Sequence, residues 1–360
     1  WSSDVCSSDL TDIGPPHYWD KMPEMSKKNY GQWQYHEYLK PGVMKHVGPA
    51  GALYTVRVGS PRLLSIETLR WFADIADKYC DGKLRFTSRH NVEFLLEDES
   101  KIDALVEEVE AAGWPVGGTG KSLKNMLHTQ GWVHCHSAAT DASGTVKAVM
   151  DDLFEYFKKD DLPAKLKISM ACCLNMCGAV HCSDIAWVGI HRKIPRVNDA
   201  EVAHSCEIPN IIASCPKAAI KPNPKAKSVT INEEKCMYCG NCFSVCPALP
   251  IADPENDGIA IFVGGKVSNA RTAPTFSKLA VPYIPNEPPR WDTLVKTIRH
   301  LVEVWVENAR KGERYGEWIE RIGWEKFFEL TGLEFTDKHI DDFTFSVKTF
   351  HTGNGFKFTK

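Results

Sequence analysis

Residues 170–180 read Met-Ala-Cys-Cys-Leu-Asn-Met-Cys-Gly-Ala-Val, and this stretch decides how the rest of the chain is interpreted. Cys172 and Cys173 are adjacent, and Cys177 follows after three residues. A further thiol, Cys135, lies upstream. Four thiols around the end of one predicted strand are poorly explained as small buried hydrophobic residues, the usual role of an isolated cysteine. The spacing instead favours ligands of an iron–sulfur cluster.

A second cysteine run lies further along the chain, with the spacing C-x2-C-x2-C-x3-C-P over residues 236–247. Such a run holds a 4Fe-4S cluster, and its fourth cysteine usually binds the other cluster of a pair. Residues 214–216, Ser-Cys-Pro, keep only the end of a second run. By this crossed pattern Cys215 joins Cys236, Cys239 and Cys242, and Cys246 loses its role. Cys246 as the fourth ligand is the alternative, and a zinc site is less favoured.

Composition narrows the class of protein. The 360 residues are 43% apolar, and this length suggests two or three domains. The cysteines cluster at spacings that a disulfide framework rarely uses, so we expect thiolates in a reducing cytoplasm. No run approaches the roughly 18 apolar residues of a membrane span and no signal peptide opens the chain, so no stable membrane insertion is expected. A net charge of −3 gives no reason to expect nucleic acid binding.

The first third of the chain predicts a small α+β half-domain. Residues 53–58 alternate as a strand, and Ser65 is the N-cap of a following helix. A strand over 84–96 and a helix over 101–112 complete a βαβα order, which places helices on one side of a sheet. Residues 11–50 are interpreted as an N-terminal interface arm. Residues 1–10 differ in composition from the rest of the chain and are interpreted as an artefact of sequence assembly.

Two predicted strands carry cations on one face. Because alternate side chains of a strand point to opposite sides, Arg85 and Arg89 share a face with Glu93. Lys165 and Lys167 alternate in the same way just before the paired cysteines. An oxyanion or a carboxylated cofactor would supply the charged partner that such a face needs. A solvated strand face is the alternative.

These features resemble the dissimilatory sulfite reductases, within the siroheme sulfite and nitrite reductase family. The resemblance rests on residues 170–180, the Pro-x-Lys-x-Lys strand before them, residues 85–93, the ferredoxin run and Gly-Gly-Lys-Val at 264–267. It covers nearly all of the chain after Trp19. The short length and the sequence Cys-Met-Tyr-Cys-Gly-Asn-Cys at 236–242 are similar to the beta subunits of the family.

The resemblance implies an α+β fold in three parts. A ferredoxin-like sulfite/nitrite reductase half-domain is expected at 51–125, and a siroheme/4Fe-4S domain at 126–200 and 264–335. A bacterial-type ferredoxin domain is expected as an insert at 201–263. Residues 336–360 are expected to form a C-terminal interface arm.

The resemblance also implies which cysteines bind the iron–sulfur clusters. Relatives hold a cluster beside siroheme with a C-x5-C and a C-x3-C pair, but Asp141 stands six residues after Cys135 here, so Cys172 is the substitute. Cys177 would bridge this cluster to the siroheme iron. Siroheme and two 4Fe-4S clusters per chain are therefore expected. The ligands are Cys135, Cys172, Cys173 and Cys177 at one cluster and Cys215, Cys236, Cys239 and Cys242 at the other.

The implied reaction is the six-electron reduction of sulfite to sulfide, with electrons supplied through the ferredoxin cluster. His134 and His136 flank Cys135 and are candidate proton donors, with His134 preferred. Siroheme is rich in carboxylates, so cations can serve the cofactor instead of the substrate. The catalytic candidates are Cys177, His134, Arg85, Arg89, Lys165 and Lys167, and the cofactor-binding set is Arg57, Arg85, Arg89, Lys165, Lys167, Cys177, Lys266 and Arg271.

The family builds its sites between two pseudo-symmetric halves, and a chain of this length has one. The resemblance therefore implies an alpha subunit in an α2β2 assembly, with a small sulfur-carrier protein that ends in cysteine as a further partner. Residues 130–132, Gln-Gly-Trp, stand where relatives have an Arg-Asn pair, which suggests that one siroheme is structural. Two alternatives stay open: a non-catalytic electron-transfer and scaffold subunit, and a siroheme nitrite reductase. These residues do not distinguish the reduction of sulfite from the reverse oxidation of sulfide.

Overall fold

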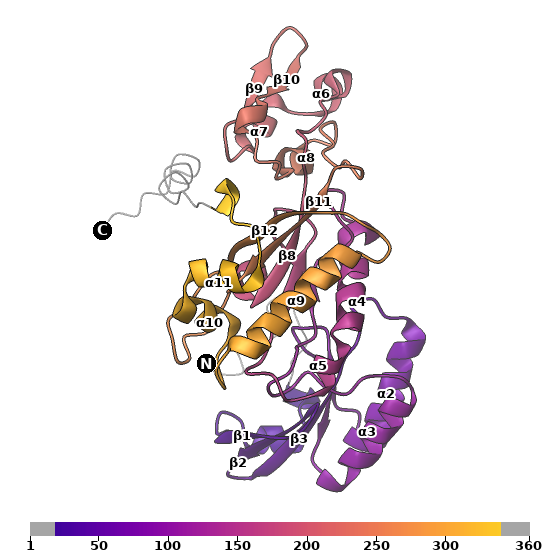
Figure 1. Ribbon diagram of the computed structural model, residues 1–360. Helices are drawn as coiled ribbons and strands as arrows, with labels where there is room; N and C mark the ends of the chain where they lie inside the picture. The colour runs from indigo at the N-terminus through magenta and orange to yellow at the C-terminus, as the bar shows by residue number, and fades with distance from the viewer. Residues whose placement is uncertain (1–18, 340–360) are drawn as a thin grey trace, which may run out of the picture. The chain divides into compact units, whose positions relative to one another are not determined.

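The computed structural model describes residues 19–339, which divide into two units (Figure 1). The first contains the chain up to Asn125 together with Phe154–Leu166, and the second contains Met126–Leu153 and the chain from Lys167 on. The sequence interpretations of residues 1–10 and of the outer parts of both arms lie outside the described residues.

The first unit is built on a five-stranded antiparallel sheet in the order β1-β2-β3-β5-β4. Residues 35–48, which the sequence assigned to an interface arm, form two strands of this sheet. The assignment fails because Val43 is fully buried in the core of the unit. The strands are β1 Tyr35–Lys40, β2 Val43–Gly48, β3 Gly51–Val58, β4 Leu84–Phe86 and β5 Val92–Leu96.

Two helices, α2 Ile66–Cys80 and α3 Ile102–Ala111, pack on this sheet side by side (Figure 1). The predicted N-cap is confirmed, because the Ser65 hydroxyl accepts a hydrogen bond of 3.1 Å from the backbone N–H of Thr68. Phe72, Phe94 and Leu105 are buried in the core between helices and sheet. Each such side chain contributes roughly 1.5–3 kcal/mol by burial. Short helices α1 Glu24–Lys28 and α5 Phe154–Lys158 complete the unit.

The single strand predicted over 84–96 is instead a hairpin of β4 and β5. The backbone turns between them, where the N–H of Thr87 donates to the carbonyl of Asn91 at 2.9 Å and His90 takes a φ of 63°. The Thr87 hydroxyl also accepts from the backbone N–H of Asn91 at 3.1 Å. These local bonds interrupt the alternation, so Arg89 lies in the turn and not on the strand face.

The second unit is built on a mixed sheet in the order β12-β11-β8-β7-β6. The pairs β6/β7 and β7/β8 are parallel, whereas β8/β11 and β11/β12 are antiparallel. Helices α4 Ala142–Asp152 and α9 Asp292–Asn308 pack against each other beside the sheet, and α10 Tyr315–Ile322 and α11 Trp324–Thr331 follow (Figure 1). The strands are β6 Leu127–His128, β7 Ile168–Ala171, β8 Ile185–Ile190, β11 Gly258–Val263 and β12 Lys278–Pro285.

An insert interrupts this sheet between β8 and β11. It has a hydrophobic core of its own, which includes Val202, Ile211 and Leu249. The expected insert boundary at residue 263 is too late, because Gly258–Val263 form β11 of the main sheet and Gly258 pairs with Ile190. The elements of the insert are α6 Asp199–Ser205, α7 Ile208–Ala213, β9 Ile220–Asn223, β10 Ser228–Ile231 and α8 Asn241–Val245.

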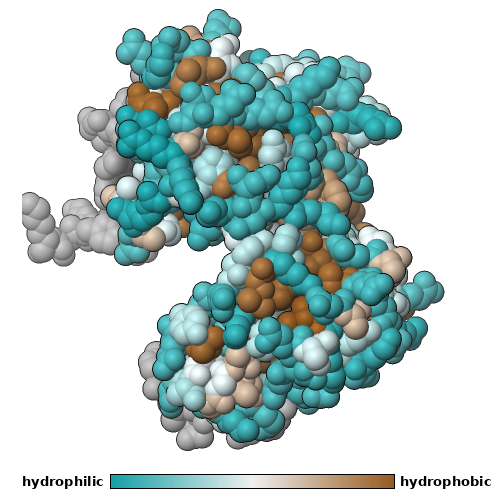
Figure 2. All heavy atoms as spheres, turned by 60° about the horizontal axis from the view of Figure 1, so that its bottom comes forward, coloured by the Kyte–Doolittle hydropathy of each residue, from teal (hydrophilic) through white to brown (hydrophobic). Residues whose placement is uncertain are grey.

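Apolar side chains also reach the surface. Figure 2 shows them on one face of the molecule as separate patches among polar side chains. The most exposed large ones among the described residues are Leu63 at 77%, Phe276 at 67%, Ile66 at 60% and Phe86 and Phe335 at 59%.

Candidate iron–sulfur sites

Strand topology explains why the first cysteine set comes together. Strands β6 and β7 are parallel neighbours, so the segments that follow them leave from the same edge of the sheet. Cys172 comes directly after β7, and its backbone N–H donates to the Thr129 hydroxyl just after β6 at 2.9 Å. Its carbonyl accepts from the N–H of Ala139 at 2.8 Å. These bonds bring the loop that carries Cys135 beside the paired cysteines.

The Ser137 hydroxyl lies between two of these thiols. Its Oγ is 3.6 Å from the Sγ of Cys135 and 3.8 Å from the Sγ of Cys173. Ser137 is buried, as are Cys172 and Cys173. Two of the four predicted ligands, Cys135 and Cys173, thus flank one side chain that the sequence interpretation did not single out.

The paired cysteines differ in acidity. A hydrogen bond from Cys172 lowers the pKa of Cys173 to about 7 although burial opposes this, and Ser137 adds to the lowering. The same bond, together with burial, raises the pKa of Cys172. Because a metal binds the thiolate, Cys173 is the more readily available ligand of the two.

Cys177 lies beyond a tight turn and is exposed. The turn closes with a bond of 3.0 Å from the N–H of Met176, whose φ is 49°, to the carbonyl of Cys173. The residue after Cys177 must be glycine, because a Cβ at Gly178 would stand 2.4 Å from the carbonyl oxygen of Met170. This close approach holds the thiol of Cys177 at the outer end of the set.

The second cysteine set faces a small cavity in the insert. Cys215, Cys236, Cys239 and Cys242 all line it. Burial, together with the other three thiols, raises the pKa of Cys242 to about 11. Backbone N–H groups already point at two of the sulfurs, from Ala219 to Cys215 at 3.2 Å and from Tyr238 to Cys236 at 3.5 Å. Buried thiolates that repel one another need a shared cation, and this donor set fits a 4Fe-4S cluster.

A single metal ion is a different case. Within residues 19–339, no three His, Cys, Asp or Glu side chains converge as ligands of one ion. The thiols around a four-iron cube stand further apart than the ligands of one ion, so a cluster needs no such convergence.

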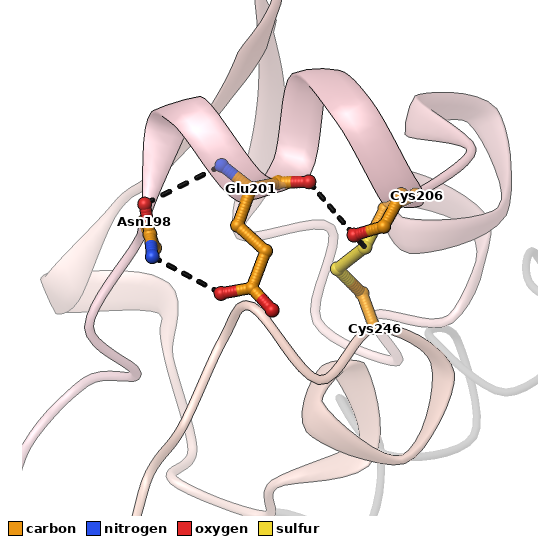
Figure 3. Close-up of a disulfide and its surroundings, with 5 residues drawn as sticks. Asn198, Glu201, Cys206 and Cys246 are labelled. Atoms are coloured by element: carbon orange, nitrogen blue, oxygen red, sulfur yellow. Dashed lines mark hydrogen bonds between the residues drawn. A yellow bond between two sulfur atoms is a disulfide. The ribbon is translucent and has the colours of Figure 1, made fainter.

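Cys246 is bonded to Cys206 in a disulfide (Figure 3). The two residues are the C-caps of α8 and α6, and Cys246 is fully buried in the core of the insert. Helix α6 is itself held at its start by the Asn198 side chain, which accepts from the N–H of Glu201 at 3.4 Å. The expectation of thiolates throughout is therefore wrong for this pair, because folding brings two helix ends together across 40 residues.

The cations of the first unit have a carboxylate between them. Glu93 lies opposite Arg57 on one side and Arg85 on the other. Its Oε1 accepts from Arg57 Nη2 at 2.8 Å and its Oε2 from Arg85 Nε at 2.5 Å. Glu93 of the same sheet thus supplies part of the negative charge that these arginines were expected to need. The Arg85 side chain is still 58% exposed.

This arrangement sets the acidity of Glu93, whose side chain is 1% exposed. Burial raises the pKa of Glu93, but the charges and hydrogen bonds of Arg57 and Arg85 outweigh it, so the pKa lies below its ordinary value. Glu93 therefore stays ionised, and the three residues together keep one net positive charge.

The remaining predicted cations differ in how far they are engaged. Arg89 donates to the carbonyl of Asn125 at 3.0 Å, and Lys165 is exposed in the first unit. Lys167 is the first residue of the second segment of the second unit and is half-buried. Lys266 is 2% exposed, and its Nζ donates to the Ser268 carbonyl and to both oxygens of Thr272 at 2.7–3.0 Å. Arg271 is exposed and donates to the carbonyl of Gly312.

The two candidate proton donors also differ. His134 is exposed at the end of a short 3-10 helix, Gly131–Val133. The ring of His136 instead packs edge-on against Phe243 of the insert, with centroids 4.9 Å apart. Sequence spacing offered no signal for this contact, because the two residues lie in separate motifs.

Comparison with known proteins places the chain in a family. The model for the nitrite and sulphite reductase 4Fe-4S domain matches residues 119–339, and that for the nitrite/sulfite reductase ferredoxin-like half domain matches residues 46–112. The dissimilatory-type sulfite reductase subunit beta of Archaeoglobus fulgidus is 58% identical over 92% of this chain and 93% of its own length. The chain belongs to the dissimilatory sulfite reductases of the nitrite and sulfite reductase family. The resemblance inferred from the cysteine motifs is confirmed, as is the α+β fold class.

Other relatives extend the comparison. The same subunit from Nitratidesulfovibrio vulgaris is 56% identical over 93% of this chain and 91% of its own length. The dissimilatory-type sulfite reductase subunit alpha of Allochromatium vinosum is 28% identical over 78% of this chain and 70% of its own length. A crystal structure of dissimilatory sulfite reductase I superposes with a TM-score of 0.80 at 20% identity, covering 94% of this chain and 87% of that one, which is a likeness of fold. In the described part of the chain, no helix has the length and apolar character to span a membrane.

Proposed function

We propose that this chain is the beta subunit of a dissimilatory sulfite reductase and takes part in the six-electron reduction of sulfite to sulfide. The observation that carries the proposal is that the second unit contains two separate cysteine sets, one at the edge of the main sheet and one in the insert. A redox enzyme that moves several electrons one at a time needs a carrier and an acceptor site, and two sets provide both.

The first set would hold a 4Fe-4S cluster with Cys135, Cys172, Cys173 and Cys177. The exposed position of Cys177 suits it to bridge this cluster to a siroheme. When bound, siroheme and its cluster would supply the iron that binds sulfur and the electrons that reduce it. The low pKa of Cys173 favours loading of this set near neutral pH.

The insert would be a ferredoxin domain whose cluster is held by Cys215, Cys236, Cys239 and Cys242. The cavity that the four cysteines share supports this set. Two clusters per chain follow. The disulfide of Cys246 supports Cys215 as the fourth ligand, because it engages the thiol of the competing residue.

The chain's cations would bind and orient anions. The exposed guanidinium of Arg85 and the exposed amine of Lys165 suit sulfite or siroheme carboxylates, with Arg89 and Lys167 beside them in sequence. Arg57 holds Glu93, so its role would be to orient this carboxylate and through it Arg85. The exposed His134 would deliver a proton. Lys266 would shape its loop, since the oxygens of Ser268 and Thr272 already take its Nζ donors.

An alpha subunit would complete the siroheme sites in an α2β2 assembly in the cytoplasm. Relatives include proteins named as alpha subunits. Exposed apolar side chains such as Leu63 and Phe86 support a protein partner, because burying them at an interface would remove apolar surface from water. A small sulfur-carrier protein with a C-terminal cysteine would be a further partner.

Substitution of the bridging thiol tests the proposal. The chain is co-expressed with its alpha subunit, iron and siroheme are counted per chain, and sulfite-dependent oxidation of a reduced viologen is measured. We expect Cys177→Ser to abolish this activity, whereas Cys80→Ser, at a buried thiol of the first unit, keeps it. A wild-type complex without siroheme contradicts the proposal. Unchanged sulfite reduction by Cys177→Ser points to a scaffold subunit, and preference for nitrite points to a nitrite reductase.

A further inference from the structure

A buried hydrogen-bonded pair, His191 and Asp257, closes the neck of the insert, where the two chain segments join it to the main sheet. His191 follows the last residue of β8, and Asp257 precedes the first residue of β11. The Nδ1 of His191 is 2.8 Å from the Oδ2 of Asp257, and each residue is 2% exposed. The chain therefore enters and leaves the insert through two side chains that bind each other.

The other face of His191 reaches the first cysteine set. Its Nε2 is 3.0 Å from the carbonyl oxygen of Ser137. Both ring nitrogens of His191 thus lie within hydrogen-bond distance of an oxygen atom. Asp257 also accepts from the backbone N–H of Asp253 at 2.9 Å and of Arg192 at 3.3 Å. The Asp257 carboxylate therefore binds the backbone at both the entry and the exit of the insert.

The side chain of Ser137 faces two predicted cluster ligands. Its single hydroxyl hydrogen can be donated to sulfur, with Cys135 at 3.6 Å and Cys173 at 3.8 Å. A hydrogen bond to a ligand sulfur stabilises the more negative, reduced cluster and so raises its reduction potential. The position of this hydroxyl depends on the backbone that His191 holds.

The same short loop also touches the second cysteine set. His136 packs edge-on against Phe243, the residue after Cys242. A Cβ built on Gly240, the residue after Cys239, would lie 3.9 Å from the Cβ of Ser137. Residues 135–137 therefore contact the thiols of one set and the backbone segment that carries the other.

We infer that Asp257, His191 and Ser137 form a positioning relay between the two cluster sites. The His191–Asp257 pair fixes the neck of the insert and the backbone of Ser137, and the Ser137 hydroxyl would raise the potential of a cluster bound at Cys135. With both clusters bound, this difference in potential would favour electron transfer from the insert toward the cluster at Cys135. These are positioning residues, and the inference rests on the proposed function because it requires both clusters.

The test is an EPR-monitored redox titration of each cluster in the complex with the alpha subunit. We expect Ser137→Ala to make the potential of the Cys135 cluster more negative, by about 59 mV for a tenfold loss of electron affinity in a one-electron couple. The potential of the insert cluster should not move. Ser137→Thr keeps the hydroxyl and should restore the wild-type value. Ser228→Ala is the matched control, at a buried serine of the insert whose hydroxyl has no hydrogen-bond partner.

A second pair of variants tests the neck. His191→Gln and Asp257→Asn should shift the potential of the Cys135 cluster in the same direction as Ser137→Ala. They should also weaken or broaden the magnetic coupling between the two reduced clusters, because the loop between them is no longer held in one position. If either variant fails to fold, the Ser137 series decides the question.

The outcomes separate the two proposals. A wild-type complex that lacks either cluster overturns the proposed function and the relay with it. A folded Ser137→Ala complex with both clusters and an unmoved potential overturns the relay alone.

Discussion

At the scale of single residues, surroundings decide what each cysteine can do. Cys246 belongs by spacing to the ferredoxin run, yet it is buried in the core of the insert and bonded to Cys206. Cys215 lies outside the run, yet it shares a cavity with the first three cysteines of the run. The sequence predicts Cys215 in place of Cys246 as the fourth ligand because the Cys-Pro remnant at residues 215–216 keeps the crossed pattern, and this assignment remains a prediction. It could not predict the disulfide, which depends on how two helices end.

Substitution of these residues should separate the two roles. We expect Cys215→Ser to remove the insert cluster, seen as the loss of its EPR signal and of about four irons per chain. Cys246→Ser should keep both, because its thiol is not a ligand in the proposed site. Cys206→Ser is the matched control, since it breaks the same disulfide. Loss of the signal in Cys246→Ser with retention in Cys215→Ser would reverse the assignment.

Glu93 makes a prediction about acid stability. Because its folded pKa is below the ordinary value of 4.5, its ionised form stabilises the fold fully above about pH 4.5, and this contribution is lost as pH falls through the folded pKa. Glu93→Gln should lower the free energy of unfolding by about 1–3 kcal/mol at pH 7 and flatten its dependence on pH below 4.5. Urea unfolding at several pH values measures both. Glu107→Gln, at an exposed position of α3, should change neither.

At the scale of elements, one buried pair ties a strand to a helix. Arg314 precedes α10, and its Nε and Nη2 donate to the two oxygens of Asp184 at 2.9 and 2.7 Å. Asp184 precedes β8 and also accepts from the backbone N–H of Lys167 at 2.7 Å, just before β7. This carboxylate is fully buried, so it joins β7, β8 and α10 where water cannot compete.

Breaking this pair should be costly. Asp184→Asn leaves the Arg314 guanidinium buried without its counter-charge, and we expect a loss of about 3–5 kcal/mol in the free energy of unfolding. Chemical denaturation of the purified protein gives this value. Glu329→Gln, in the exposed pair with Lys326, offers a control that should leave stability unchanged within error.

Elements also show where sequence reasoning reached its limit. Helix α2 and its Ser65 cap follow from local periodicity and capping, so they could be predicted. The strand over 84–96 could not be divided in advance, because the turn depends on the side chain of Thr87 and not on Gly or Pro. The relay escaped prediction for a different reason. Ser137 and His191 lie 54 residues apart, and only the pairing of β8 with β11 brings Asp257 to them.

At the scale of the whole molecule, the distribution of exposed apolar residues predicts a partner. Phe86 and Leu63 of the first unit are more than half exposed. We expect the chain co-expressed with its alpha subunit to elute as a larger species with siroheme, and Phe86→Glu to weaken that association. Size-exclusion chromatography with light scattering measures the assembly. Lys159→Glu, at an exposed position of the same unit, serves as the control. If Phe86→Glu assembles to the same extent as the wild-type chain, Phe86 does not lie in the interface.

The pairing of Ile190 with Gly258 has a consequence for how such a chain can be built. The insert begins and ends on residues that face each other across one antiparallel ladder, so a two-residue turn can join β8 directly to β11 as an ordinary hairpin. Closing so short a loop leaves the register of the sheet unchanged. The insert is therefore a removable module, which a gene can gain, lose or exchange without redesign of the sheet that receives it.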